Sequence, residues 1–400
     1  MSAQGETPSR GGTAFWNDQQ FRSVFFQLLV VAAVVAFGWY LFHNTSANLD
    51  RQGIASGFDF WNSTAGFGII DTWIEYSEES TYGRVFWVGL LNTLTVSILG
   101  IILATIIGFT IGVARLAPNW LISRMATVYI ETLRNIPLLL QIFFWYGLIL
   151  KGFPKIRDSY DIFGTVFLNN RGLYTPKPIF EPGTWMMFLG FGMAIAGIVW
   201  LSVWSRRRQN LTGQQFPVFL TSLGIFFGLP SLGLIMASLV YGGVPISFDY
   251  PEMQAFNFKG GSELIPELVA LLMALSAYTA AFIAEIVRAG IMAVSHGQTE
   301  AAHSLGLRNG QTLRLVVIPQ ALRVIIPPLT SQYLNLTKNS SLAAAIAYPE
   351  LVSVFAGTVL NQTGQAVEVI GITMAIYLGL SLSISAFMNW YNKRVALVER

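Results

Sequence analysis

Two pairs of oppositely charged residues stand at the edges of long apolar runs. Glu131 and Arg134 precede one run, and Glu285 and Arg288 follow another, with a spacing of three residues in each pair. Residues three apart are neighbours on an α-helix. Ionisable groups are costly inside a membrane and mark functional sites there. Two interpretations stay open: the pairs orient helices at the membrane surface, or they contact the carboxylate and ammonium of a zwitterion on a transport pathway.

Two uncharged polar residues lie within the apolar runs themselves. Gln141 and Asn335 each carry an amide among aliphatic neighbours. A polar side chain in a membrane helix either lines a water-filled pathway or joins helices by hydrogen bonds. Both interpretations stay open for both residues.

The residue types needed for enzymatic chemistry are sparse. The chain has no cysteine, which excludes thiolate metal sites and cysteine nucleophiles. Its histidines, His43, His296 and His303, do not form an HExxH motif, so we expect no metal site. No Gly-Lys dipeptide occurs, hence no Walker A loop for a nucleotide phosphate. The sequence therefore predicts a protein that is not an enzyme and binds no cofactor of its own.

The composition predicts a membrane protein. Of 400 residues, 53% are hydrophobic and only 11% are charged, whereas soluble domains average about 25% charged. The mean hydropathy is +0.54. The aromatic content of 14% excludes a disordered chain. A net charge of +3 is too small to indicate nucleic-acid binding.

Eight uncharged or nearly uncharged runs are candidates for membrane spans, since a helix needs about 20 residues to cross the hydrocarbon core. They are 24–42, 85–114, 136–150 (extendable back to 127), 185–204, 216–241, 268–284, 321–337 and 369–390. The first run is longer than a signal-peptide core and lacks an A-x-A site, so we interpret it as a retained anchor, with a signal peptide as the alternative. The sequence predicts an all-α integral membrane protein with about eight transmembrane helices.

The charges of the connecting segments predict the orientation. Residues 1–23, 115–134, 205–215, 285–323 and 391–400 together carry 15 basic and 6 acidic residues. The alternate segments, 43–84, 151–184, 242–267 and 338–368, carry 9 basic and 15 acidic residues. An excess of Lys and Arg marks the cytoplasmic side. We therefore expect both termini in the cytoplasm and 43–84 outside, although the five basic residues of 151–184 run against the rule.

One cytoplasmic segment, residues 289–319, has more internal order than a simple connector. Ser295 is suited to cap a short helix, and Glu300, Ala301 and Ala302 give that helix a small-residue surface. Gly306 is suited to end it in a left-handed conformation. One interpretation is a helix-turn-helix that only connects two spans.

The other interpretation comes from a resemblance. Glu300-Ala301-Ala302, three residues, Gly306, nine residues and a Val-Val-Ile-Pro sequence ending at Pro319 resemble the EAA loop of type I ABC importer permeases. Val316 and Ile318 replace the usual Ile and Leu of that loop. Residues 131–141, 278–290 and 338–342 resemble further segments of the polar amino-acid permeases, with Asn339 and Ser340 departing from the pattern. The added spans resemble the larger permease subunits of bacterial general L-amino-acid importers.

The resemblance implies a fold and a set of partners. The fold would be a type I ABC transporter transmembrane domain over 85–390, with an extra N-terminal helix and a two-helix insertion at about 185–241. Glu300, Ala301, Ala302, Gly306 and Pro319 would form the loop that couples to a separate ABC ATPase. Further partners would be a second, paralogous permease subunit in a heterodimer and a periplasmic amino-acid-binding protein. The location implied is the bacterial inner membrane, with ATP used only by the partner ATPase.

The function expected is that of a permease subunit for polar or broad-range L-amino acids. The alternative is a secondary amino-acid carrier driven by an ion gradient. Such carriers often contain inverted repeats and broken helices. The chain shows no clear repeat, but Pro327 and Pro328 are residues that break helices. A membrane scaffold without a transport role is a third possibility.

Overall fold

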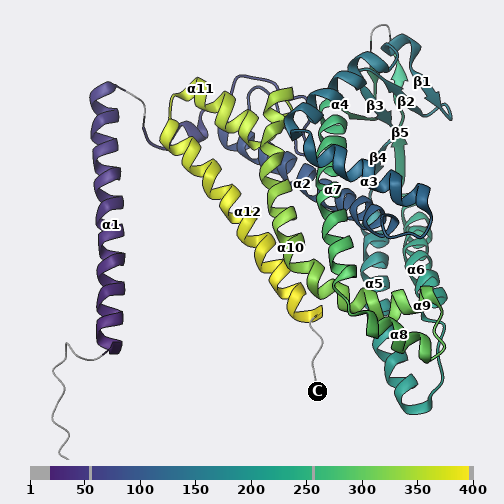
Figure 1. Ribbon diagram of the computed structural model, residues 1–400. Helices are drawn as coiled ribbons and strands as arrows, with labels where there is room; N and C mark the ends of the chain where they lie inside the picture. Colours follow the sequence, from purple (N-terminus) through teal and green to yellow (C-terminus); the bar gives the residue numbers. More distant parts are fainter. Residues whose placement is uncertain (1–18, 54–55, 255–256, 396–400) are drawn as a thin grey trace, which may run out of the picture. The chain divides into compact units, whose positions relative to one another are not determined.

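The chain is mostly helical in the computed structural model, which describes residues 19–53, 56–254 and 257–395 (Figure 1). The α-helices are α1 (Gln19–Gln52), α2 (Tyr82–Ala114), α3 (Trp120–Asn135), α4 (Leu138–Gly152), α5 (Thr184–Thr212), α6 (Val218–Tyr241), α7 (Pro266–Met292), α8 (His296–Ser304), α9 (Asn309–Thr312), α10 (Ile318–Asn339), α11 (Leu360–Thr363) and α12 (Ala366–Val395). Two π-helical segments are η4 (Leu313–Val317) and η6 (Val352–Val359). Short 3-10 helices are η2 (Asp59–Asn62), η3 (Ile156–Asp158) and η5 (Ser340–Ile346).

Within the described residues, seven helices are long and apolar enough to cross a membrane, or eight if one bent pair counts as a single span. This agrees with the predicted fold class. Helix α1 extends to Gln52 and is therefore longer than the predicted span 24–42. Helix α10 continues through Pro327 and Pro328. These prolines therefore do not break the helix, which removes the one feature that favoured a secondary carrier.

The third predicted span, 136–150 with a possible extension back to 127, is bent in the structure. Helices α3 and α4 meet at an angle of 108°, with the break at residues 136 and 137. Pro137 has no N–H to continue a helical ladder, and it disfavours helical geometry at the preceding Ile136. Ile136 is extended, with ψ of 127°. Glu131 and Arg134 consequently lie in the last turns of α3 rather than at the start of the span.

Short strands form in the two segments that flank the α5–α6 pair. The main sheet has the order β1 (Tyr160–Ile162), β2 (Val166–Asn169), β3 (Gly172–Thr175), β8 (Ser262–Leu264), all antiparallel. Two further pairs are β4 (Lys177–Phe180) with β5 (Ile246–Asp249) and β6 (Glu252–Met253) with β7 (Phe258–Lys259). These strands were not predicted. Their pairing joins residues 151–184 to 242–265 and thereby holds the ends of the inserted helical hairpin together.

Two compact units make up the fold. The first comprises residues up to Leu94 together with Pro349–Phe387, and the second comprises Thr95–Tyr348 and the residues from Met388 onward. The core of the first is aromatic, with Phe60, Tyr82 and Phe355 buried together. The core of the second is largely aliphatic and lies between α4, α7 and η5.

The second unit is organised along α7. Strands β1 to β3 lie towards the N-terminal end of α7, and α8 and α9 lie at its C-terminal end (Figure 1). Helix α2 packs closely on α7 because Gly108 and Gly112 present no side chain there. A Cβ atom at Gly108 would lie 2.6 Å from Cβ of Ile283, and one at Gly112 would lie 2.7 Å from the carbonyl oxygen of Ala284.

Candidate functional site

The segment that follows α7 forms a short exposed helix. Three residues separate Met292, the last residue of α7, from α8. Ser295 is the N-cap residue of α8, but its side chain makes no capping hydrogen bond. Gly306 ends the helical turn with a φ of +79°, in the left-handed region that glycine alone adopts without strain. Its amide donates to the carbonyl of His303 at 2.8 Å. The left-handed glycine predicted from sequence is therefore present.

The predicted coupling residues divide between the two faces of α8. Glu300 and Ala301 are exposed, whereas Ala302 is only 3% exposed and faces the protein. Oε1 of Glu300 lies 3.0 Å from Nδ1 of His296, one turn earlier. Leu305, at the end of the helix, is 83% exposed. The outer face of α8 thus presents one acidic group and an uncovered leucine.

A cavity of about 600 Å³ lies behind α8. It is lined mainly by apolar side chains from the end of α7 and from η4, together with Leu116 after α2 and with Thr299 and His303 of α8. The hydroxyl of Thr312, which also lines it, is buried and has no hydrogen-bond partner within the described residues. Helix α8 contacts the rest of the protein through the buried Ala302 and through a hydrogen bond from Nε2 of Gln320 on α10 to Oε1 of Gln298 at 3.1 Å, with open space beside it.

Pro319 stands at the start of α10. It is the second residue of that helix, and the residues just before it, Val317 and Ile318, already have right-handed helical geometry. The π-helical turn η4 leads directly into it.

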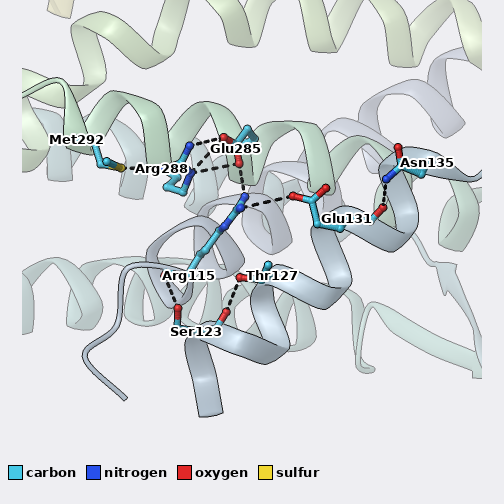
Figure 2. A network of polar contacts seen from close by, with 8 residues as sticks. All are labelled: Arg115, Ser123, Thr127, Glu131, Asn135, Glu285, Arg288 and Met292. Atoms are coloured by element: carbon cyan, nitrogen blue, oxygen red, sulfur yellow. Dashed lines mark hydrogen bonds and ion pairs between the residues drawn. The ribbon is translucent and has the colours of Figure 1, made fainter. Parts of the chain in front are cut away.

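A cluster of four charged residues lies around the last turns of α7, before the segment that contains α8 (Figure 2). Arg115, just after α2, bonds to Glu285 on α7 through Nη1 and lies 3.5 Å from Glu131 on α3 through Nη2. Arg288 donates to Oε1 of Glu285 from Nε at 3.1 Å and from Nη2 at 2.6 Å. We call Arg115, Glu131, Glu285 and Arg288 the charge cluster.

The structure therefore brings three of the four charged residues predicted for the pathway together and leaves the fourth, Arg134, outside the cluster. Glu285 pairs with Arg288 as the spacing predicted, but Glu131 is bonded to Arg115 rather than to Arg134. The guanidinium of Arg134 lies over the ring of Phe282 on α7, 5.2 Å from the centroid. Arg134 thus packs against α7 without joining the charge cluster.

Arg115 is the member of the cluster that sequence reasoning missed. The sequence feature that could have identified Arg115 is its position directly after the 30-residue uncharged run 85–114, the longest predicted span. The predictions paired charges by local spacing, and Arg115 has no acidic residue three or four positions away. Its partners lie 16 and 170 residues further along the chain.

Gln141 stabilises the bend between α3 and α4. Its side chain is 4% exposed, and Nε2 donates to the carbonyls of Leu133 and Ile136, both at 2.9 Å. Those carbonyls belong to the last turn and the C-cap of α3, whose helical hydrogen bonds end at the break. The geometry favours the hydrogen-bonding interpretation of Gln141 over the pathway interpretation.

Asn335 lies apart from these contacts. It is exposed on α10, and the next residue, Leu336, is buried against Gly100 of α2. Its amide is thus available to whatever covers this face of α10, and its role on a substrate pathway stays a prediction.

A fully buried acid, Glu350, was not predicted as a functional residue. It lies in the first unit, is fully buried, and accepts hydrogen bonds from the backbone N–H of Val352 at 2.8 Å and of Ser353 at 2.7 Å. The hydroxyl of Tyr377 donates to it at 3.1 Å. Burial raises the pKa of Glu350 to about 7, against the lowering effect of these hydrogen bonds. It caps the start of η6.

The described residues contain no group of three or more His, Asp or Glu side chains placed to hold a metal ion. Residues 97–397 match the family described as "Binding-protein-dependent transport system inner membrane component". The chain belongs to this family. It is thus a transport permease with several membrane-spanning helices, and the family match includes the charge cluster, α8 and Gly306.

Close relatives of this permease cover nearly its whole length. The protein YhdX of Escherichia coli strain K12 is 54% identical over 391 residues, which is 98% of each chain. The general L-amino acid transport system permease protein AapQ of Rhizobium johnstonii is 50% identical over 383 residues, covering 96% of this chain and 94% of AapQ. A crystal structure of an amino acid ABC transporter with histidines is 21% identical, with a TM-score of 0.45 over 78% of this permease and 95% of that chain.

Proposed function

We propose that this permease is one membrane subunit of an ATP-binding-cassette importer for L-amino acids. The observation that carries the proposal is the 50% identity to AapQ, a general L-amino acid transport system permease, over nearly the whole of both chains. The glutamate/glutamine/aspartate/asparagine transport system permease protein BztB of Rhodobacter capsulatus is 43% identical over 414 aligned positions, covering 96% of each chain. Polar amino acids are therefore the substrates to test first.

The complex we propose contains three kinds of partner. An ABC ATPase supplies the energy, since this chain has no Walker A sequence. A paralogous permease completes the membrane pathway, and a periplasmic binding protein delivers the substrate. In this arrangement both termini and α8 face the cytoplasm, and the strands β1 to β8 face the periplasm. The excess of basic residues in the segment that contains α8 supports this orientation.

The coupling contact we propose is the outer face of α8. Glu300 and Ala301 are exposed on a short helix, and Leu305, which follows that helix, is also exposed. An exposed apolar side chain beside small residues is suited to a partner's cleft. The cavity behind α8 leaves room for the helix to shift when the partner moves.

The energy source separates the importer from a secondary carrier. We would reconstitute the purified complex in liposomes, enclose ATP, and measure the uptake of labelled L-glutamate in competition with other L-amino acids. Uptake should require ATP and the binding protein and should persist when ionophores dissipate ion gradients. Uptake that ionophores abolish and that needs no ATPase would contradict the importer.

The coupling role of α8 is tested by valine at two glycines of the same segment. Gly306→Val forces a β-branched residue to a φ of +79° and should distort the end of α8. Gly310→Val is the matched control, because Gly310 has no positive φ and a Cβ atom added there would have no neighbour within 4 Å. We expect Gly306→Val alone to lose both transport and substrate-stimulated ATP hydrolysis. If both activities persist, the coupling role of this segment is wrong.

A further inference from the structure

Arg115 is the side chain at which three helices of the second unit meet. It follows α2, bonds to Glu285 on α7, and reaches Glu131 on α3 (Figure 2). Its side chain is 18% exposed, compared with 26% for Glu285 and 55% for Glu131. The most buried member of the charge cluster is therefore also the one that connects its helices.

Neighbouring contacts hold the same three helices in register. The hydroxyl of Ser123 on α3 donates to the backbone carbonyl of Arg115 at 2.8 Å. Further along α3, the hydroxyl of Tyr129 donates to the carbonyl of Ala277 on α7 at 2.8 Å. Helix α3 is thus hydrogen-bonded both to Arg115 at the end of α2 and to α7. The side chain of Arg115 adds a bond between the end of α2 and α7.

The chemistry of the cluster requires a guanidinium at this position. A guanidinium offers several N–H groups in a fixed plane and can bond two carboxylates at once, whereas a lysine ammonium acts as a point charge. Glu285 already shares its Oε1 with Arg288 and leaves Oε2 for Arg115. Two acids and two bases balance, so removing Arg115 would leave a surplus of negative charge on α3 and α7.

The charge cluster lies close to α8 along the chain, because Glu285 and Arg288 belong to the last turns of α7. Glu285 is seven residues before the end of α7, about 10 Å along a helix, and only three residues separate that end from α8. A rigid helix transmits displacement along its axis to whatever is bonded to it. A shift of α8 would therefore reach Arg115, and through it α2 and α3, by way of Glu285.

We propose that Arg115 is a positioning residue for coupled transport, which transmits movement of α8 and α7 to α2 and α3. The proposal rests on the proposed function, because it assumes an ATPase that moves α8. Arg115 acts here through the other helices and does not contact the substrate. A direct contact between the cluster and the substrate zwitterion is the competing outcome of the test.

The test measures how many ATP molecules are hydrolysed per amino acid imported by the reconstituted complex. Arg115→Met removes the charge and retains an apolar stem. Arg124→Met removes the same charge from an exposed position on α3 for which no ion pair is found among the described residues. We call the number of ATP molecules hydrolysed per amino acid imported the ATP cost. We expect Arg115→Met to raise the ATP cost by about fivefold or more, which is the lower end of typical coupling effects. Arg124→Met should have the ATP cost of the wild type.

Two further variants separate a positioning role from loss of folding. Arg115→Lys keeps the positive charge but bonds one carboxylate, so its ATP cost should fall between the wild type and Arg115→Met. Adding Glu285→Gln to Arg115→Met should raise the number of ATP molecules hydrolysed per amino acid by less than the sum of the two single changes, since both changes remove the bond between Arg115 and Glu285. If Arg115→Met does not assemble, Arg115→Lys decides, and a wild-type ATP cost in this variant would contradict the proposal.

Other outcomes also give a decision. A wild-type ATP cost in Arg115→Met overturns the proposal. If that variant also has a raised KM for the amino acid, the result indicates that the cluster contacts the substrate. Failure of the proposed function has a different signature. In that case the wild-type complex itself imports no amino acid on addition of ATP.

Discussion

At the scale of single residues, the charge cluster and Glu350 show two different ways of placing charge. The members of the charge cluster neutralise one another, and their bonds cross between helices. Glu350 instead has no cationic partner among its hydrogen bonds, which come from two backbone amides and from the hydroxyls of Tyr377 and Thr93. A carboxylate buried without a counter-charge favours its protonated form.

Glu350 should therefore make the stability of the protein depend on pH. Its folded-state pKa of about 7 lies above the ordinary value of a carboxyl group, so the folded state holds a proton that the unfolded state releases first. This contribution to stability is fully present below the ordinary pKa and is lost as the pH rises to about 7. The thermal unfolding midpoint of the purified protein should fall over this range.

The variant Glu350→Gln should remove that part of the pH dependence, because an amide does not titrate. Glu252→Gln, at an exposed position on β6, serves as the control and should leave the dependence unchanged. An identical pH dependence in the wild type and Glu350→Gln would show that Glu350 does not titrate as we expect.

At the scale of elements, close packing of α2 on α7 places Arg115 within reach of Glu285. Three glycines at intervals of four or eight residues make this packing possible, with Gly100 against Leu336 of α10 and with Gly108 and Gly112 against α7. Small residues at four-residue spacing allow backbones to approach closely in membranes. The bend between α3 and α4 was not predicted from apolar composition, although Pro137 at the break is a residue that disfavours a continuous helix.

Gly108→Ala should separate α2 from α7. The new Cβ atom would lie 2.6 Å from side-chain carbons of Ile283, which is too close for any carbon pair. We expect a destabilisation of about 1–3 kcal/mol, as for other overpacked cores. The measurement is unfolding of the purified protein in mixed detergent micelles by increasing denaturing detergent.

The matched control is Gly192→Ala on α5, where a Cβ atom has no neighbour within 4 Å. Alanine has the higher helix propensity, so the control should be neutral or slightly stabilising. Equal effects of the two substitutions would contradict the close packing of α2 on α7.

At the scale of the whole molecule, the scarce charges predict which side of the membrane each segment faces. The basic segments include α8 and the charge cluster, whereas most of the opposite segments are acidic. The segment 151–184 is basic and yet pairs with 242–265 through β3 and β8 and through β4 and β5. Segments that share a sheet must lie on the same side, so this pairing supports the predicted side for 151–184 despite its charge.

The absence of cysteine allows a direct test of this orientation. Phe163→Cys places a thiol at a 96% exposed position between β1 and β2, and Leu305→Cys places one at an 83% exposed position after α8. In cells with a permeabilised outer membrane, a membrane-impermeant maleimide should label only the thiol at position 163. Labelling at position 305 before the inner membrane is lysed would contradict the orientation.

The sequence by itself determined the features that depend on neighbouring residues. Apolar runs predicted the helices, the spacing of Glu285 and Arg288 predicted their bond, and Gly306 predicted a left-handed turn. Tertiary structure alone decided the position of Arg115 between α7 and α3, the 108° bend that Gln141 stabilises, and the pairing of β3 with β8. The physical reason is separation along the chain. Arg115 and Glu285 are 170 residues apart, and only the packing of α2 on α7 brings a guanidinium and a carboxylate together over that distance.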